Sequence, residues 1–79
     1  MNENIIPLSS LPLGRKAKIA VLNSHGADRR RMLDLGLIWN TEVEALQKSP
    51  SGDPVAYQIR GAVIAIRQEE ASKILVEAI

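Results

Sequence analysis

The chain has 79 residues, no cysteine, and ten basic against nine acidic residues, which gives a formal net charge of +1. This length predicts one domain near the lower size limit for an unassisted core, and the lack of cysteine excludes disulfides, zinc knuckles and thiol nucleophiles. The balanced charge gives no general attraction to nucleic acid or to an anionic membrane. Hydrophobic residues make up 46% of the chain, and a core this small needs most of them, so little remains to line a large organic-substrate pocket.

The amino-terminal stretch indicates a soluble protein. The longest uncharged run, residues 4–14, contains two prolines and is much shorter than the roughly 20 apolar residues of a membrane-spanning helix. The first residues also lack the positively charged region of a secretory signal. We therefore expect a cytoplasmic protein without direct membrane insertion.

Residues 1–14 are rich in isoleucine and leucine but are interrupted by Pro7 and Pro12. Because proline lacks a backbone donor, this stretch is not expected to be a central strand. We predict an ordered arm whose leucines cover one side of the core, with Ser9-Ser10 in a tight turn and Gly14 at its end.

A half-buried strand is predicted over residues 15–22, where apolar and polar positions alternate. Its apolar face would consist of Ala17, Ile19 and Val21. The turn-forming residues 23–26 then lead into a helix.

This short helix is predicted over residues 28–37, with an apolar side formed by Met32, Leu33 and Leu35. Asp28 at its start can accept from free backbone N–H groups and suits the positive end of the helix dipole. Gly36 would end the helix at positive φ, which lets Leu37 fold back on Met32. We expect this helix to close the open end of a small barrel.

The second and third strands are predicted on either side of residues 49–54, Ser-Pro-Ser-Gly-Asp-Pro, which are a strong loop signal. Before the loop, residues 41–45 alternate with Thr41, Val43 and Ala45 on one face. After the loop, residues 55–60 alternate again.

Gly61 is predicted to make a tight hairpin turn into a fourth strand over residues 62–66, which is too apolar to have one solvent-exposed face throughout. A helical turn over residues 68–73 and a last strand over residues 74–79 complete the chain. We therefore predict a mainly β protein with one domain over residues 1–79. Its fold is a small barrel of about five antiparallel strands, with one short α-helix after the first strand and a helical turn before the last.

Six short motifs follow one another along the chain: Ser-Leu-Pro-Leu-Gly at 10–14, Arg-Arg-Arg-Met-Leu-Asp-Leu-Gly-Leu at 29–37, Gly-Asp-Pro at 52–54, Arg-Gly at 60–61, Ile-Arg at 66–67 and Glu-Ala at 70–71. Their order and spacing, which cover nearly the whole chain, resemble the FeoA family of bacterial ferrous iron uptake. The resemblance implies an SH3-like fold, which also recurs in the carboxy-terminal domain of iron-dependent repressors. It further implies a cytoplasmic, non-catalytic accessory to the membrane transporter FeoB. Where family members usually have Pro-Gly, this chain has Trp39-Asn40.

A metal site is poorly supplied with ligands, although transition-metal binding is associated with the family. The chain has one histidine and no cysteine, whereas Fe(II) and Zn(II) favour imidazole and thiolate. Asp28, Asp34 and Asp53 could form only a weak oxygen site. His25 is either a solvated loop residue or a ligand or pH-sensitive contact. We predict no metal-binding residues and no cofactor.

The basic triplet Arg29-Arg30-Arg31 has three interpretations. Arg30 and Arg31 are four and three residues before Asp34, a spacing that allows ion pairs along the helix. The triplet could instead contact an acidic partner, or a nucleic acid. Nucleic-acid binding is disfavoured, because SH3-like RNA-binding barrels need aromatic stacking platforms and this chain has only Trp39 and Tyr57.

No arrangement of nucleophile and base is evident, and most acidic residues fall on outward positions. We therefore predict no catalytic residues and no enzymatic activity.

The sequence thus favours a binding module whose contact zone is residues 29–40, with the cytoplasmic part of a FeoB-type transporter as partner. The expected contact residues are Arg29, Arg30, Leu37, Trp39 and Asn40. Trp39 is either an interface anchor or a local core residue. The alternative function is an SH3-like regulatory or adaptor domain of the iron-dependent repressor type, which would bind a peptide or linker segment. Weak self-association is also left open.

Overall fold

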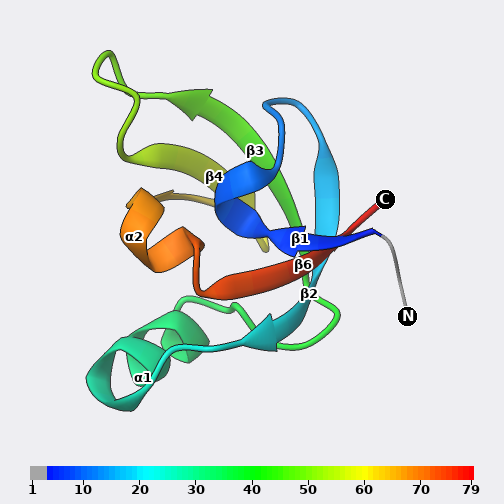
Figure 1. The fold of residues 1–79 in the computed structure, drawn as a ribbon, viewed down its shortest axis with the longest axis vertical. Coiled ribbons are helices and arrows are strands. Elements are labelled where there is room, and N and C mark those ends of the chain that lie inside the picture. Colours follow the sequence, from blue (N-terminus) through cyan, green and yellow to red (C-terminus); the bar gives the residue numbers. More distant parts are fainter. Residues whose placement is uncertain (1–3) are drawn as a thin grey trace.

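The computed structural model describes residues 4–79, so the first three residues of the predicted arm lie outside the described residues. Figure 1 shows strands and short helices wrapped around one core. The elements in chain order are β1 (Ile5–Pro7), the 3-10 helix η1 (Leu8–Ser10), β2 (Lys16–Leu22), α1 (Gly26–Asp34), β3 (Glu42–Lys48), β4 (Val55–Ile59), β5 (Ala62–Ile66), α2 (Gln68–Ala71) and β6 (Ile74–Ala78).

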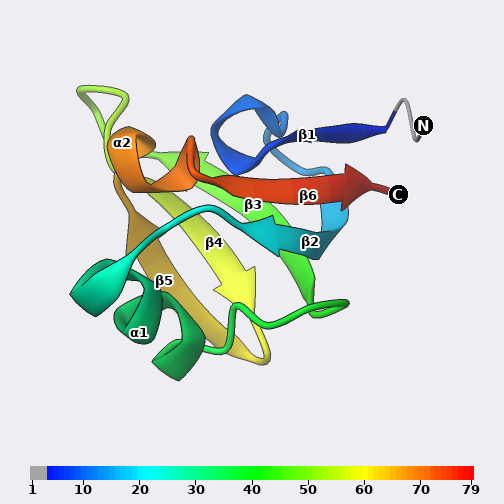
Figure 2. The same ribbon diagram turned by 60° about the horizontal axis from the view of Figure 1, so that its bottom comes forward.

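The six strands form a single antiparallel sheet in the order β1-β6-β2-β3-β4-β5. Figure 2 shows the sheet coiling from β1 at the upper right to β5 at the lower left. The predicted mainly β fold is confirmed, with its helix after β2 and its helical turn before β6. Two details differ, because the sheet has a sixth strand and its two end strands, β1 and β5, are not paired with each other.

The sixth strand comes from the arm. β1 pairs only with β6 and lies at the edge of the sheet, with Ile5 opposite Glu77 and Pro7 opposite Leu75. An edge strand tolerates proline, since one row of its backbone groups needs no partner. Directly after β1, Leu8 and Leu11 are buried in the core. These two leucines of the arm therefore cover the core as predicted, whereas Leu13 is 47% exposed.

Two β-bulges bend the central strands. In β2 the pairing with β6 shifts between Ile19 and Val21, and in β3 the pairing with β4 shifts between Ala45 and Gln47. An extra residue rotates the following side chains to the other face and increases the local twist. The prediction that Val21 faces the core is therefore wrong, and its side chain is 46% exposed.

The core lies inside the curved sheet and is capped by the arm and the helices. It consists of Leu8, Leu11, Ala17, Ile19, Met32, Leu37, Val43, Ala45, Tyr57, Ile59, Ile66, Ala71, Ile74 and Val76. These residues come from η1 and the segment after it, from strands β2 to β6, from both α-helices, and from the connection after α1. These side chains form one small core, and Ile6, Leu22, Leu35, Val55 and Ile64 are partly buried against it.

β5 does not follow its prediction. Its side chains alternate, with Ile64 and Ile66 toward the core and the residues between them toward solvent. Ile66 is buried, whereas Val63 is 66% exposed. An apolar strand of this kind can therefore have one solvent-exposed face.

α1 begins at Gly26, two residues earlier than predicted, and His25 at the N-cap makes no side-chain capping bond. Asp28 consequently lies within the first turn and does not cap the helix, although it remains near the positive end of the dipole. Asp28 and Arg31 share a surface hollow with Ala65 of β5. This places α1 beside β5, the open end of the sheet (Figure 2).

The end of α1 follows the prediction closely. Gly36 has φ +97°, and its amide donates to the carbonyl oxygen of Leu33 at 3.0 Å. The amide of Leu37 donates to that of Met32, also at 3.0 Å. This pair of hydrogen bonds defines a Schellman motif. Met32 and Leu37 are both buried, so the chain folds back into the core immediately after the helix.

None of the helices in residues 4–79 has the length and apolar character that crossing a bilayer requires.

Candidate interaction surface

The turn that follows α1 is fixed against the sheet by backbone hydrogen bonds. The amide of Thr41 donates to the carbonyl oxygen of Ile38 at 3.1 Å, which closes the turn. The amide of Asn40 donates to the carbonyl oxygen of Ile19 at 2.7 Å, and the amide of Ile19 donates to that of Thr41 at 2.9 Å. Asn40 has φ +70°, which asparagine tolerates better than most residues. The bend therefore forms without the usual Pro-Gly.

Trp39 lies at the tip of this turn and is 76% exposed. It is therefore not a core residue, and burial gives no structural reason for a tryptophan here. Two further apolar side chains are exposed nearby in the chain, Leu33 at 39% and Ile38 at 43%. We use the term α1–turn surface for six of the exposed residues of α1 and the following turn, namely Arg29, Arg30, Leu33, Ile38, Trp39 and Asn40.

The three arginines of the triplet have different environments. Arg29 donates from Nη1 to the carbonyl oxygen of Leu22 at 2.9 Å, which ties α1 to the end of β2. Arg31 forms an ion pair with Glu70 of α2. Arg30 is exposed. The predicted pairing of Arg31 with Asp34 is replaced by this contact with a distant helix.

Leu37 supports the α1–turn surface from beneath. Its side chain is completely buried, so it packs in the core and does not face a partner. Of the five predicted contact residues, Arg29, Arg30, Trp39 and Asn40 are exposed. The structure therefore brings four of them to the surface of α1 and its following turn.

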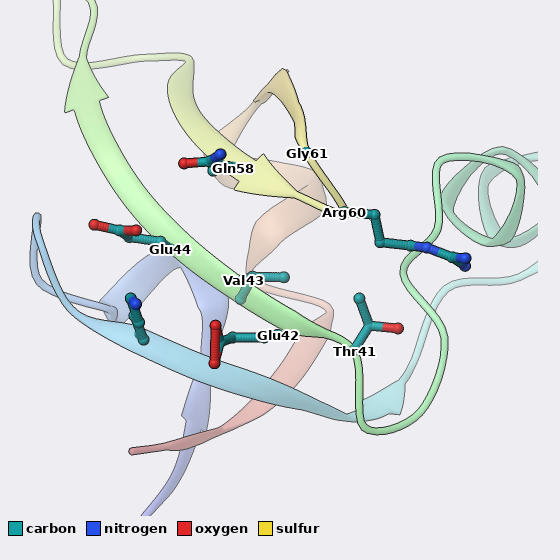
Figure 3. Close-up of a pocket in the computed structure, with 8 residues that line it drawn as sticks. Thr41, Glu42, Val43, Glu44, Gln58, Arg60 and Gly61 are labelled. Carbon is teal, nitrogen blue, oxygen red and sulfur yellow. The ribbon is translucent and has the colours of Figure 1, made fainter.

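Two shallow hollows adjoin this region. One, of about 340 Å³, lies on α1 and is lined by Gly26, Arg29, Arg30, Leu33 and Asp34. The other, of about 380 Å³, lies on the outer face of β3, and Figure 3 shows the side chains around it. It is lined by Lys16, Thr41, Glu42, Val43, Glu44, Gln58, Arg60 and Gly61. Both are open depressions on the surface.

Potential metal ligands are dispersed. Among residues 4–79, no three side chains of the His, Asp and Glu types are grouped so that they could hold a metal ion. His25 is exposed at the start of α1. Asp53 instead serves the fold, because its Oδ1 accepts from the backbone amide of Gln68 at 2.8 Å.

Sequence reasoning missed three residues near the surface: Leu33, Ile38 and Arg60. The first two are apolar, and apolar residues are expected inside by default. The run Leu37-Ile38-Trp39 within a turn was a signal, since consecutive apolar residues in a turn cannot all be buried. For Arg60 the signal was its place immediately before Gly61, where a two-residue hairpin turn favours asparagine or glycine.

A small, strongly curved antiparallel sheet with a helix in its first long connection defines an SH3-like domain. The FeoA domain family model matches residues 6–78. The chain belongs to the FeoA family, which is associated with ferrous iron transport.

A curated relative from Porphyromonas gingivalis is an Fe(2+) transport protein A/Fe(2+) transporter FeoB fusion protein. It is 36% identical over 72 residues, which are 91% of this chain and 8% of the relative. The chain thus spans only a small part of the fusion protein's length.

Solved structures of FeoA proteins share the fold. The FeoA protein of Chlorobium tepidum is 32% identical with a TM-score of 0.88, over 94% of this chain and 70% of its own. The zinc complex of FeoA from Stenotrophomonas maltophilia, described as a procaryotic SH3 domain protein, is 34% identical with a TM-score of 0.77. That match covers 89% of this chain and 87% of the other.

A manganese-dependent transcriptional repressor also has this fold in part of its chain. The TM-score is 0.84 over 95% of this chain and 42% of the repressor, at 14% identity. At this level the match demonstrates a shared fold alone, which agrees with the expected recurrence of the fold in repressors.

Proposed function

We propose that this chain is a non-enzymatic, cytoplasmic accessory domain of bacterial ferrous iron uptake. It binds the cytoplasmic part of a FeoB-type transporter through the α1–turn surface. The relative in which transport protein A and FeoB form one polypeptide supports this pairing, because fusion keeps two domains close enough to act on each other.

The observation that carries the proposal is the exposure of Trp39. A tryptophan that is 76% exposed leaves a large apolar area in water, and such residues frequently anchor protein interfaces. Leu33 and Ile38 extend the exposed apolar area. Arginine and tryptophan are both enriched at interface hot spots, and Arg30 supplies an exposed cation on α1.

Modulation follows from binding alone. A domain without catalytic groups can change a transporter only by binding one of its conformational states more tightly than another. The bound domain then shifts the populations of those states by its difference in affinity. The small rigid core, with its backbone-anchored turn, suits this role because little conformational entropy is lost when it binds.

The experiment is a calorimetric titration of the purified cytoplasmic part of the cognate FeoB-type transporter with wild-type protein and with Trp39→Ala. We expect the substitution to weaken binding about tenfold or more and to leave thermal unfolding nearly unchanged, since Trp39 is exposed. Val63→Ala, which trims another exposed apolar side chain on β5, is the control. Unchanged affinity combined with a sharply lowered melting temperature would assign Trp39 a structural role instead.

The alternative, an adaptor domain that recognises a peptide or linker, predicts a different partner. Co-purification from cells that carry the tagged protein, followed by mass spectrometry, distinguishes the two. Recovery of the transporter supports the proposal, whereas recovery of a DNA-binding protein without the transporter supports the alternative.

A further inference from the structure

Arg60 occupies an unfavourable backbone conformation. Ile59 of β4 pairs with Ala62 of β5, so Arg60 and Gly61 form a two-residue hairpin turn. Both have positive φ, +51° for Arg60 and +82° for Gly61, as a type I′ turn requires. The first position of such a turn favours asparagine, aspartate or glycine, because other side chains crowd the backbone at positive φ. The turn alone therefore gives no reason for an arginine.

The aliphatic part of Arg60 is confined by the end of α1. A Cβ atom placed on Gly36 would lie 3.0 Å from Cδ of Arg60 and 3.7 Å from its Cγ. The side chain thus passes directly over the backbone of the glycine that ends the helix. This contact restricts the rotamers open to the aliphatic part of Arg60.

The guanidinium has no ion pair or hydrogen bond within residues 4–79. Figure 3 shows it directed away from Glu44 and Gln58, toward the connection between α1 and β3. Glu42 lines the same hollow as Arg60, but the two side chains do not form an ion pair. A cation is thus held by a constrained stem beside the turn that carries Trp39, without a partner in the described part of the chain.

We propose that Arg60 is a specificity-determining residue of the interaction surface, whose guanidinium binds a carboxylate group of the transporter's cytoplasmic part. This inference rests on the proposed function. A planar guanidinium matches a carboxylate through two parallel hydrogen bonds. A stem already held in place loses less conformational entropy on binding than a free arginine does. Unfavourable backbone conformations that persist in a fold are concentrated at functional sites.

The test compares four variants in calorimetric titrations of the purified cytoplasmic part of the cognate transporter, each at low and at high salt. Arg60→Met keeps the stem and removes the charge, and Arg60→Lys keeps the charge without the planar fork. Arg60→Gly suits the positive φ and removes the whole side chain. The control is Arg67→Met, which removes an exposed arginine at the other end of β5.

At low salt we expect Arg60→Met and Arg60→Gly to bind at least about fivefold more weakly than wild type, with Arg60→Lys between them. The affinity of both uncharged variants should also depend less on salt, because a charge pair has been lost. Arg67→Met should remain within about twofold of wild type. Thermal unfolding of Arg60→Gly should not be lowered, which separates a binding defect from a folding defect.

The outcomes distinguish the two proposals. Absence of binding by the wild-type protein overturns the proposed function and this inference with it. Wild-type binding with equal affinity for Arg60→Met, or full affinity for Arg60→Gly, overturns the role of Arg60 alone and leaves the proposed function in place.

Discussion

The hydroxyl of Tyr57 donates to the carbonyl oxygen of Leu8 at 3.3 Å inside the core. This contact joins β4 to η1, elements that are 49 residues apart in the sequence. The carbonyl of Leu8 also accepts from the amide of Leu11 at 3.0 Å. The arm is therefore fastened to the sheet by a buried polar bond as well as by its leucines.

Tyr57→Phe should lower the free energy of unfolding by about 0.5–1 kcal/mol, at the lower end of the range for one hydrogen bond. The loss is small because the Leu8 carbonyl keeps its bond to Leu11. Urea denaturation of both proteins at neutral pH measures it. A loss above about 3 kcal/mol would mean that the ring packs differently in the variant.

Ionisation of Tyr57 should lower the stability of the fold at alkaline pH. Burial, with a smaller contribution from the charge of Asp53, raises the pKa of Tyr57 above its ordinary value of 10.0. Above about pH 10 the unfolded chain therefore loses the tyrosine proton while the folded chain still retains it. Ionisation then favours unfolding, so this contribution to stability is present below pH 10 and is lost as the pH rises toward the folded-state pKa. Urea midpoints between pH 8 and about pH 11 should fall more for the wild type than for Tyr57→Phe, and parallel curves would contradict the assignment.

Gly36→Ala should destabilise the fold by about 1–2 kcal/mol, because the position requires positive φ. Gly52→Ala is the matched control, since Gly52 has φ +91° with no atom within 4 Å of an added Cβ. The additional loss of unfolding free energy in Gly36→Ala, relative to Gly52→Ala, then measures the cost of displacing the Arg60 side chain. Chemical denaturation gives both values, and a smaller loss at Gly36 than at Gly52 would contradict the contact.

Asp53→Ala should cost about 1 kcal/mol, the typical value of a side chain that caps a helix. Asp53 performs this function for α2 from a loop fifteen residues earlier, through its bond to the amide of Gln68. Asp53→Asn keeps a side-chain oxygen and should lose only a few tenths of a kcal/mol. Equal losses in thermal unfolding of the two variants would show that the charge, and not the hydrogen bond, matters.

Glu70→Gln should change stability by less than about 1 kcal/mol, since both partners of the Arg31–Glu70 pair are partly exposed. The change should shrink further in high salt, which screens exposed charges. Denaturation in low and high salt measures this directly. A loss of several kcal/mol that persists in salt would indicate a role beyond the ion pair.

The features predicted correctly from the sequence are those fixed by local chemistry. Gly36 could be placed at the helix end because positive φ favours glycine, and Gly61 in its hairpin for the same reason. Alternation predicted β4 and most of β2.

The errors and the choices left open share one cause, which is contact between segments distant in the sequence. Val21 turns outward because of a bulge that is defined only by pairing with β6. Arg31 pairs with Glu70, 39 residues away, and not with Asp34 within reach on its own helix. The choice between an exposed and a buried Trp39 stayed open, because it depends on where the turn is bonded to β2.

The pairing of β1 with β6 has a consequence for domain architecture. The carbonyl oxygen of Asn4 accepts from the amide of Ala78 at 3.0 Å, and Figures 1 and 2 show these ends of the chain together, on the far side from α1. A tether attached beside this edge would leave the outer side of α1 unobstructed. The domain can thus be part of a longer polypeptide or a separate protein, with the same face exposed in both cases.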